Sequence, residues 1–210
     1  MLEQLTRAAS PERFRRRQRN LLAAVVALWL VVCVGGIGLL LAYKARPGSA
    51  GEPPGSWPDA AAALARDPQR PTLVMLIHPR CPCTRASLAE LNVVLNRARG
   101  AATAYLLFSV PVEAREGWEA GESWDRAGEI PGVTRVVDRG GRLAAAFGVD
   151  VSGHTLLYDR SGRLRFSGGV TGARGHEGDN LGEARLAAAL AGDAREETSA
   201  VFGCELVKPE

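Results

Sequence analysis

The chain has 210 residues, of which 46% are hydrophobic and 23% are charged, with a formal net charge of +3. This composition excludes a disordered or a collagen-like protein, and four cysteines are too few for a disulfide scaffold. The charge is divided unevenly, because residues 1–20 contain six arginines against two acids, whereas residues 47–210 contain more acidic than basic groups. A domain that binds nucleic acid would be basic as a folded unit, so no nucleic-acid partner is expected.

Residues 21–43 form an uncharged apolar run that directly follows the arginine-rich segment RFRRRQRN. At 1.5 Å per residue, a helix of this length spans about 34 Å, which is enough to cross the hydrocarbon core of a lipid bilayer. The run is longer than the core of a cleaved signal peptide, and Lys44 and Arg46 follow it. We therefore expect an uncleaved, single-pass anchor in the inner (cytoplasmic) membrane. Its basic head (1–20) would be cytoplasmic and its C-terminal domain periplasmic or otherwise extracytoplasmic.

Residues 44–58 are rich in Gly, Pro and Ser and predict a linker, which leaves 59–210 as the folded domain. Apolar runs at 72–78 and 102–110 are typical of strands buried on both faces, and the pattern at 84–98 predicts an amphipathic helix. Helices are also expected at 59–66, within 111–131, at 141–149 and at 180–192, and strands at 133–138, 154–159 and 163–168. This order predicts an α/β fold with helices flanking a mixed sheet.

Cys81 and Cys83 lie in the segment HPRCPCT, between the strand at 72–78 and the helix at 84–98. A thiol at a helix N-terminus is stabilised as the reactive thiolate by the helix dipole and by free backbone N–H groups. Cys81 is therefore a candidate nucleophile. Arg80, directly before it, either lowers the pKa of this thiol or is simply a solvated side chain.

The segment TLVMLIHPRCPCTRASLAEL resembles the active-site segment of membrane-anchored thioredoxin-like proteins of the TlpA/ResA kind. In that family a strand ends in Trp-Cys-x-x-Cys, and the helix continues with Arg-Ala and Glu-Leu, here Arg85-Ala86 and Glu90-Leu91. The segments VVDRGGRLAAAFGV and SGHTLLYDRSGRLRFSGGV extend the resemblance over residues 65–192, and the chain is also similar to the anchored proteins named RedB. The resemblance implies a thioredoxin-like fold and Cys81 as the nucleophile of thiol–disulfide exchange.

The chain departs from that family at three positions. The second cysteine of the family falls on Thr84, the tryptophan before the first falls on Arg80, and the cis-proline falls on Gly153, which His154 follows. His154 occupies the turn that faces the cysteines in this fold family, so it is a candidate site residue. The hydroxyl of Thr84 cannot form a disulfide, but it is expected to hydrogen-bond the Cys81 thiolate.

Two cysteines are candidates for the second redox thiol. Cys83 gives a Cys-x-Cys site, whose disulfide would close a tight ring and be strained and oxidising. Cys204, in the apolar segment VFGCEL, is the alternative if that segment docks onto the domain. We favour Cys83, because its proximity to Cys81 requires no assumption about the fold. The glycine-rich segment at 167–182 is expected to border the site, with His176 as a candidate neighbour.

The first functional hypothesis is a membrane-tethered thiol–disulfide oxidoreductase without a cofactor. It would act on protein thiols and disulfides outside the cytoplasm and exchange electrons with a membrane or extracytoplasmic redox partner. The alternative is a copper-binding, chaperone-like module that uses His78, Cys81 and Cys83, since thiolate and imidazole suit Cu(I). A peroxidase fits poorly, because His78 replaces the threonine expected three residues before the nucleophile. A partner-binding scaffold with unused cysteines is the fourth possibility.

Overall fold

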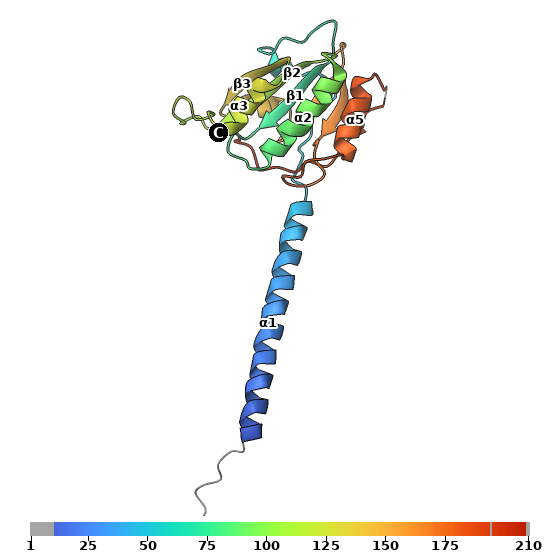
Figure 1. Ribbon diagram of the computed structural model, residues 1–210. Coiled ribbons are helices and arrows are strands. Elements are labelled where there is room, and N and C mark those ends of the chain that lie inside the picture. The colour runs from blue at the N-terminus through green and yellow to red at the C-terminus, as the bar shows by residue number, and fades with distance from the viewer. Residues whose placement is uncertain (1–10, 194, 209–210) are drawn as a thin grey trace, which may run out of the picture. The chain divides into compact units, whose positions relative to one another are not determined.

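The computed structural model describes residues 11–193 and 195–208, and the chain divides after Ala45 into two units. The described part of the first unit is one helix, α1 (Pro11–Ala45), which contains the apolar run predicted at 21–43 (Figure 1). Over Glu12–Ala45 this helix is long and apolar enough to cross a membrane, with a mean hydropathy of 2.7. The large apolar side chains along this helix are exposed.

The second unit is built on a mixed six-stranded sheet with the order β3-β2-β1-β4-β5-β6. Three strands are mutually parallel: β1 (Thr72–Ile77), β2 (Thr103–Val110) and β3 (Val133–Arg139). Strand β4 (Thr155–Tyr158) runs antiparallel to β1, β5 (Leu164–Gly168) is antiparallel to β4, and the short β6 (Glu197–Thr198) is parallel to β5. All six residues of the central strand β1 are buried, as its continuous apolar sequence predicts.

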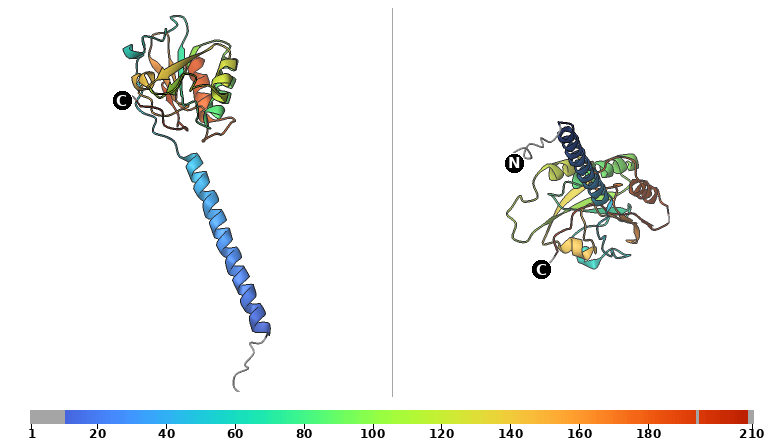
Figure 2. Two further views of the ribbon diagram at one scale, coloured as in Figure 1. Left: turned by 90° about the vertical axis from the view of Figure 1, so that its left-hand side faces the viewer. Right: turned by 90° about the horizontal axis from the view of Figure 1, so that it is seen from below.

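Helices cover both faces of the sheet. Helices α2 (Thr84–Ala98), α3 (Glu122–Glu129) and α5 (Leu181–Leu190) pack on one face, whereas the 3-10 helix η1 (Asp59–Ala61) and α4 (Arg142–Ala146) lie on the other (Figures 1 and 2). Because successive side chains of a strand point to opposite faces, β1 contributes to both cores. Leu73, Met75 and Ile77 pack beneath α2, and Val74 and Leu76 face η1 and α4.

The crossover β1-α2-β2, the hairpin β4-β5 and the closing helix α5 make up a thioredoxin-like fold, which confirms the predicted fold class. Three local differences from the predicted elements are found. The helix predicted at 59–66 is only the three-residue 3-10 helix η1. The excursion predicted at 111–131 is helical only over α3, and much of the preceding segment forms turns. Strand β6 has only two residues, too few for a periodic pattern to indicate it.

Residues 46–58, which composition predicts as a linker, are packed against the domain. Trp57 is half-buried and meets Phe147 and Tyr158 edge-on, with ring centroids 5.1 Å and 5.3 Å away. The hydroxyl of Tyr158 donates a hydrogen bond to the Pro54 carbonyl at 3.1 Å. The compact unit therefore begins at Arg46 and not at residue 59.

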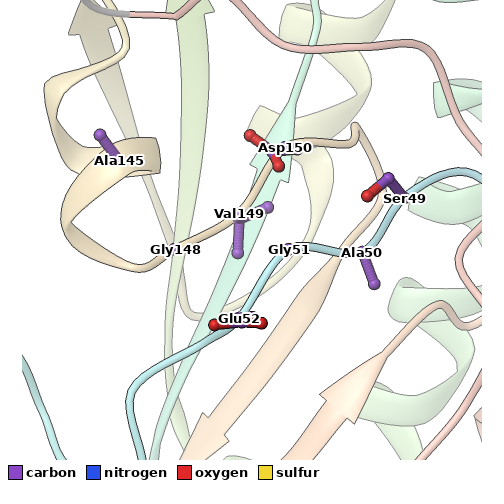
Figure 3. A pocket seen from close by; sticks show the side chains of 8 residues that line it. All are labelled: Ser49, Ala50, Gly51, Glu52, Ala145, Gly148, Val149 and Asp150. Atoms are coloured by element: carbon purple, nitrogen blue, oxygen red, sulfur yellow. The ribbon is translucent and has the colours of Figure 1, made fainter.

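Gly51 of this segment allows backbone to pack closely on backbone. Residues 49–52 lie alongside 148–150, and together with Ala145 they line an open cavity of about 540 Å³ (Figure 3). Gly51 has φ +76°, and a Cβ there would lie 2.1 Å from the Gly148 carbonyl oxygen. A side chain is therefore excluded at Gly51 both by conformation and by space.

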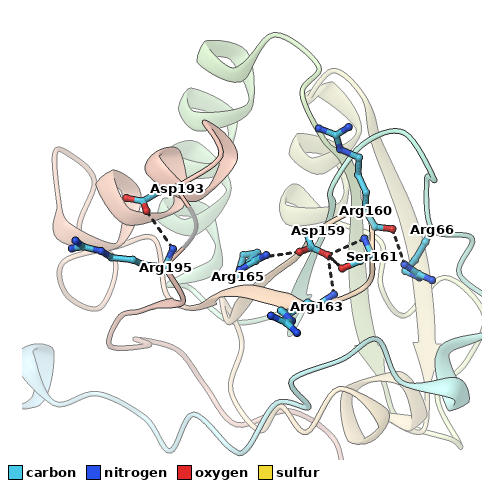
Figure 4. A network of polar contacts seen from close by, with 8 residues as sticks. All are labelled: Arg66, Asp159, Arg160, Ser161, Arg163, Arg165, Asp193 and Arg195. Atoms are coloured by element: carbon cyan, nitrogen blue, oxygen red, sulfur yellow. Dashed lines mark hydrogen bonds and ion pairs between the residues drawn. The ribbon is translucent and has the colours of Figure 1, made fainter.

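The turn between β4 and β5 is organised by one carboxylate, as Figure 4 shows. Asp159 accepts hydrogen bonds from the backbone and hydroxyl of Ser161, from the Arg163 backbone at 3.0 Å and from Arg165 Nε at 2.8 Å. Burial alone would raise the pKa of Asp159, but these hydrogen bonds outweigh it and lower the pKa to about 2. The predicted hairpin turn at 160–162 is thus closed by the residue before it.

Candidate active site

The connection from β1 to α2 places Cys81 at the start of a 15-residue helix. The turn is fixed by two backbone hydrogen bonds, from Cys81 N to His78 O at 3.0 Å and from Thr84 N to Cys81 O at 3.1 Å. Cys83 is the N-cap of α2 and already has helical backbone angles, φ −74° and ψ −20°. Cys81 is 3% exposed, whereas Cys83 is half-buried.

Thr84, at the position of the second cysteine of the resembled family, connects the start of α2 to the loop before β4. Its side chain is buried, and Oγ1 donates to the His78 carbonyl at 3.2 Å. Thr84 Oγ1 also lies 3.2 Å from Ser152 Oγ, which accepts from the His78 backbone N–H at 2.9 Å. The Thr84 hydroxyl also interacts with the Cys81 side chain and lowers the pKa of that thiol.

The C-terminal segment docks onto the same loop and brings Cys204 to the site. Ser152 N donates to Cys204 O at 2.8 Å, and Val151 pairs with Glu205 in an antiparallel bridge. The two backbones are so close at Gly203 that a Cβ there would lie 1.8 Å from the Ser152 carbonyl oxygen. Docking of this segment therefore depends on a glycine next to Cys204.

The thiols of Cys81, Cys83 and Cys204 lie together at this point, and their surroundings shift their pKa values in different directions. Burial by itself raises the pKa of Cys81, but a hydrogen bond from the Cys204 thiol, the backbone N–H groups of Cys83 and Cys204, and Thr84 together lower it below its ordinary value. Burial and the hydrogen bond to Cys81 raise the pKa of Cys204 to about 12, and burial and the Cys81 charge raise that of Cys83. Cys81 is thus the thiolate of the group, and its two neighbours are the donors.

Arg174, which is not among the residues predicted from the sequence, also belongs to the site. It lies in the glycine-rich loop between β5 and α5, and its guanidinium donates to the Gly203 carbonyl. It also hydrogen-bonds Cys83, and its charge lowers the pKa of both Cys83 and Cys204, partly offsetting their burial. The loop was expected to border the site through His176, but that residue is exposed. Nothing marks Arg174 among the 26 lysines and arginines except its place in that loop.

Arg80 and His78 form the rim of the site with a residue from the segment before α3. The Arg80 guanidinium stacks 4.3 Å from the ring centroid of Trp118, and the His78 ring meets the same indole edge-on at 5.8 Å. His78 Nδ1 accepts the Arg80 backbone N–H at 3.2 Å, and burial lowers the pKa of His78. An open cavity of about 260 Å³ adjoins this rim, lined by residues 79–82, Arg85, Glu122 and Ser123.

His154 is directed toward β5. Its side chain is fully buried, and Nε2 lies 2.9 Å from Ser167 Oγ. Burial lowers the pKa of His154 to about 4, and a contact with the Ala50 backbone offsets only part of this effect. Gly153, at the position of the resembled cis-proline, has φ +85°, and every peptide bond among the described residues is trans.

The copper-binding alternative requires His78, Cys81 and Cys83 to converge. His78 instead accepts the hydrogen bond from Arg80 and packs on Trp118. Within residues 11–193 and 195–208, no group of three or more His, Cys, Asp or Glu side chains is arranged to hold a metal ion.

Comparison with known proteins supports the fold. No protein-family model and no curated protein matches the sequence. A hypothetical protein from Sinorhizobium meliloti aligns with 24% identity and a TM-score of 0.54, covering 79% of this chain and 97% of that one. An uncharacterized conserved protein from Geobacillus kaustophilus aligns with 15% identity and a TM-score of 0.55, covering 79% and 93%. A secreted disulfide oxidoreductase of Mycobacterium tuberculosis aligns over 59% of this chain and 81% of its own, with 14% identity and a TM-score of 0.40, too distant to transfer its function.

Proposed function

We propose that this protein is a membrane-tethered thiol–disulfide oxidoreductase whose nucleophile is Cys81. The observation that supports the proposal is that the pKa values of three neighbouring thiols are shifted in different directions. The pKa of Cys81 is lowered by four interactions with hydrogen-bonding groups, two from side chains and two from backbone N–H groups, whereas the pKa values of Cys83 and Cys204 are raised. Since the thiolate is the nucleophile in disulfide exchange, one of the three thiols is prepared to attack and two are available to resolve.

The reaction proceeds in two exchanges. The Cys81 thiolate attacks one sulfur of a substrate disulfide, forms a mixed disulfide with it, and releases the other sulfur as a thiolate. A second cysteine thiolate then attacks Cys81 Sγ, and the bond between Cys81 and the substrate sulfur breaks. The substrate has gained two electrons, the protein holds a disulfide, and the proton of the resolving thiol passes to a released thiolate. Run in reverse, the oxidised protein oxidises a substrate dithiol.

Membrane tethering is proposed from α1. Its apolar side chains are exposed along the helix, and such a surface in water would be an aggregation site. The arginines before residue 21 favour a cytoplasmic N-terminus, which places the thiol domain and its protein substrates outside the cytoplasm. Protease added to intact spheroplasts is expected to remove the thiol domain, and full protection of that domain would exclude this orientation.

The finer resemblance to TlpA/ResA-like proteins and to RedB is part of this proposal. It is supported by the position of Cys81, which the structure places after a central strand and before α2. The Arg85-Ala86 and Glu90-Leu91 pairs of the resemblance both lie within α2.

Redox titration of the detergent-solubilised full chain tests the function. Equilibration in dithiothreitol buffers of graded potential, followed by alkylation and mass analysis, is expected to show two thiols converting together to a disulfide. The Cys81→Ser variant should lose this transition, and the Cys33→Ser variant, altered within α1, should retain it. A thiol count that stays constant at every potential would overturn the proposal. If anaerobically purified protein then also retained copper, the copper-binding alternative would replace it.

A further inference from the structure

We propose that Cys204 is the thiol that resolves the mixed disulfide on Cys81, and that Arg174 is the residue that positions Cys204 for this step. The proposal rests on the proposed oxidoreductase function and assigns the second half of its reaction. The redox pair is then Cys81 with Cys204 and not Cys81 with Cys83. One of its cysteines lies before α2 and the other in the C-terminal segment.

The geometry disfavours Cys83 as the partner. Cys81 and Cys83 are separated only by Pro82 in the turn that leads into α2, and a side-chain hydrogen bond connects Cys83 with Cys81, so distance alone does not separate the two candidates. The turn is fixed by the Thr84 N to Cys81 O bond, by a 3.3 Å bond from Ser87 N to Cys83 O, and by the restricted φ of Pro82. A Cys81–Cys83 disulfide would have to distort this turn, and with it the first hydrogen bonds of α2.

The geometry favours Cys204, because it approaches from a separate segment. The loop on which it docks also meets the start of α2, because Ser152 Oγ lies 3.2 Å from Thr84 Oγ1, and a side-chain interaction between Cys204 and Cys81 lowers the pKa of Cys81. The backbone of that segment is held by the Ser152 N to Cys204 O bond and by the Leu206 N to Asp150 O bond at 2.9 Å. A Cys81–Cys204 disulfide would join two segments that this backbone pairing already holds to one domain, and it would not close a tight ring within one turn.

Arg174 acts on the same segment in two ways. It donates to the Gly203 carbonyl, one residue before Cys204, and so holds the segment in place. Its own loop is anchored to α2, where Glu90 Oε1 accepts the Gly178 N–H at 2.6 Å. Arg174 also brings the positive charge that favours the thiolate of Cys204.

The charged and titratable groups that face Cys204 explain how the two exchanges are ordered. They are Cys81, Cys83 and Arg174. In the reduced protein the Cys81 thiolate and burial keep Cys204 protonated as a donor. When Cys81 enters a mixed disulfide its charge disappears, and Arg174 becomes the charge that faces Cys204. The resolving thiolate is therefore favoured only after the first exchange, and it then attacks Cys81 Sγ and expels the substrate thiolate.

Disulfide mapping of the oxidised full chain tests the pairing. Trypsin releases Cys81 and Cys83 together in the peptide CPCTR, whereas Cys204 lies in a peptide that begins at Glu196. We expect a cross-link between these two peptides that survives in the Cys83→Ser variant and is lost in the Cys204→Ser variant. A disulfide within CPCTR, or one between Cys83 and Cys204, would overturn this inference but leave an oxidoreductase. Absence of any redox-dependent disulfide would overturn both proposals.

Reaction with the aromatic disulfide DTNB tests Arg174. In a Cys33→Ser, Cys83→Ser background, attack by Cys81 releases one thionitrobenzoate, and resolution by Cys204 releases the second, leaving protein without an adduct. Arg174→Gln is expected to slow the second phase about tenfold at neutral pH and to move its pH midpoint upward, since an opposite charge is lost beside the thiol. Arg174→Lys should restore part of the rate.

The matched control is Arg142→Gln, an exposed arginine on α4 at the opposite face of the sheet. It should leave both phases unchanged. If Arg174→Gln slowed the second phase without moving its pH midpoint, Arg174 would only hold the segment, and the electrostatic role would be rejected. If the Cys204→Ser variant still released two equivalents of thionitrobenzoate and the protein carried no thionitrobenzoate adduct, Cys204 would not be the resolving thiol.

Discussion

The side chain of Cys204 interacts with that of Cys81 and lowers the pKa of its thiol, although Cys204 follows α5 and β6 and Cys81 lies in the turn between β1 and α2. The contact exists because the C-terminal segment pairs with the loop before β4 through Ser152. Thr84 stands where a second cysteine is expected from the resemblance, and its hydroxyl also interacts with Cys81 and lowers the pKa of that thiol. The site thus keeps one thiol at the helix and receives another from a distant part of the chain.

Replacing Thr84 with valine should raise the pKa of Cys81, because the hydroxyl whose interaction lowers it is removed. The variant also removes the hydrogen bond that Thr84 donates to the half-buried His78 carbonyl, at an expected loss of about 1 kcal/mol in the free energy of unfolding. The pH dependence of iodoacetamide labelling, read by mass spectrometry, measures the first effect. Thr134→Val, at an exposed position on β3, is the control. An unchanged labelling profile for Cys81 would show that Thr84 does not support its thiolate.

Acid should destabilise the domain through His154. Its pKa is about 4 in the folded protein and 6.5 when unperturbed, so folding favours the neutral ring. The resulting stabilisation is complete above pH 6.5 and is lost as the pH falls toward 4, at a cost of about 3 kcal/mol. Denaturant unfolding of the full chain at several pH values measures this loss, and His154→Gln should remove it. The His176→Gln variant, altered at an exposed histidine, should show the same dependence of the free energy of unfolding on pH as the wild type. An equal pH dependence in all three proteins would contradict the prediction.

Replacing Gly203 with alanine should detach the C-terminal segment from the loop before β4. The new Cβ would lie 1.8 Å from the Ser152 carbonyl oxygen, so one backbone has to move. Cys204 should become more readily alkylated, and the pKa of Cys81 should rise as it loses the Cys204 donors. Gly55→Ala is the control, because nothing lies within 4 Å of a Cβ there. The two effects are read from labelling rates, and unaltered Cys204 labelling would argue against the docking.

Trp57→Ala should destabilise the thiol domain, although composition places Trp57 in a linker. Its ring packs on Phe147 and Tyr158, and its loss should cost about 3 kcal/mol, the lower end for a large aromatic, since it is half-buried. Chemical denaturation followed by circular dichroism measures the change. A variant as stable as the wild type would show that the folded unit begins after this residue.

Much of the architecture can be predicted from local pattern. The buried run at 72–78 predicts the central strand β1, and the amphipathic spacing at 84–98 predicts α2 with its observed bounds. Both signals depend on side chains that repeat with the period of the element, so they need no knowledge of distant contacts. The turn at 160–162 is equally local, because it is closed by hydrogen bonds to the adjacent residue, Asp159.

Local sequence patterns therefore predict the apolar helix at the N-terminus, the α/β order of the domain and the place of Cys81 between a strand and a helix. Contacts between distant segments bring Cys204 and Arg174 to Cys81, direct His154 toward Ser167 and pack residues 46–58 on the domain. These outcomes depend on the close approach of segments far apart in the chain. Such an approach is set by glycine contacts and backbone hydrogen bonds between segments, which leave no periodic trace in either segment alone.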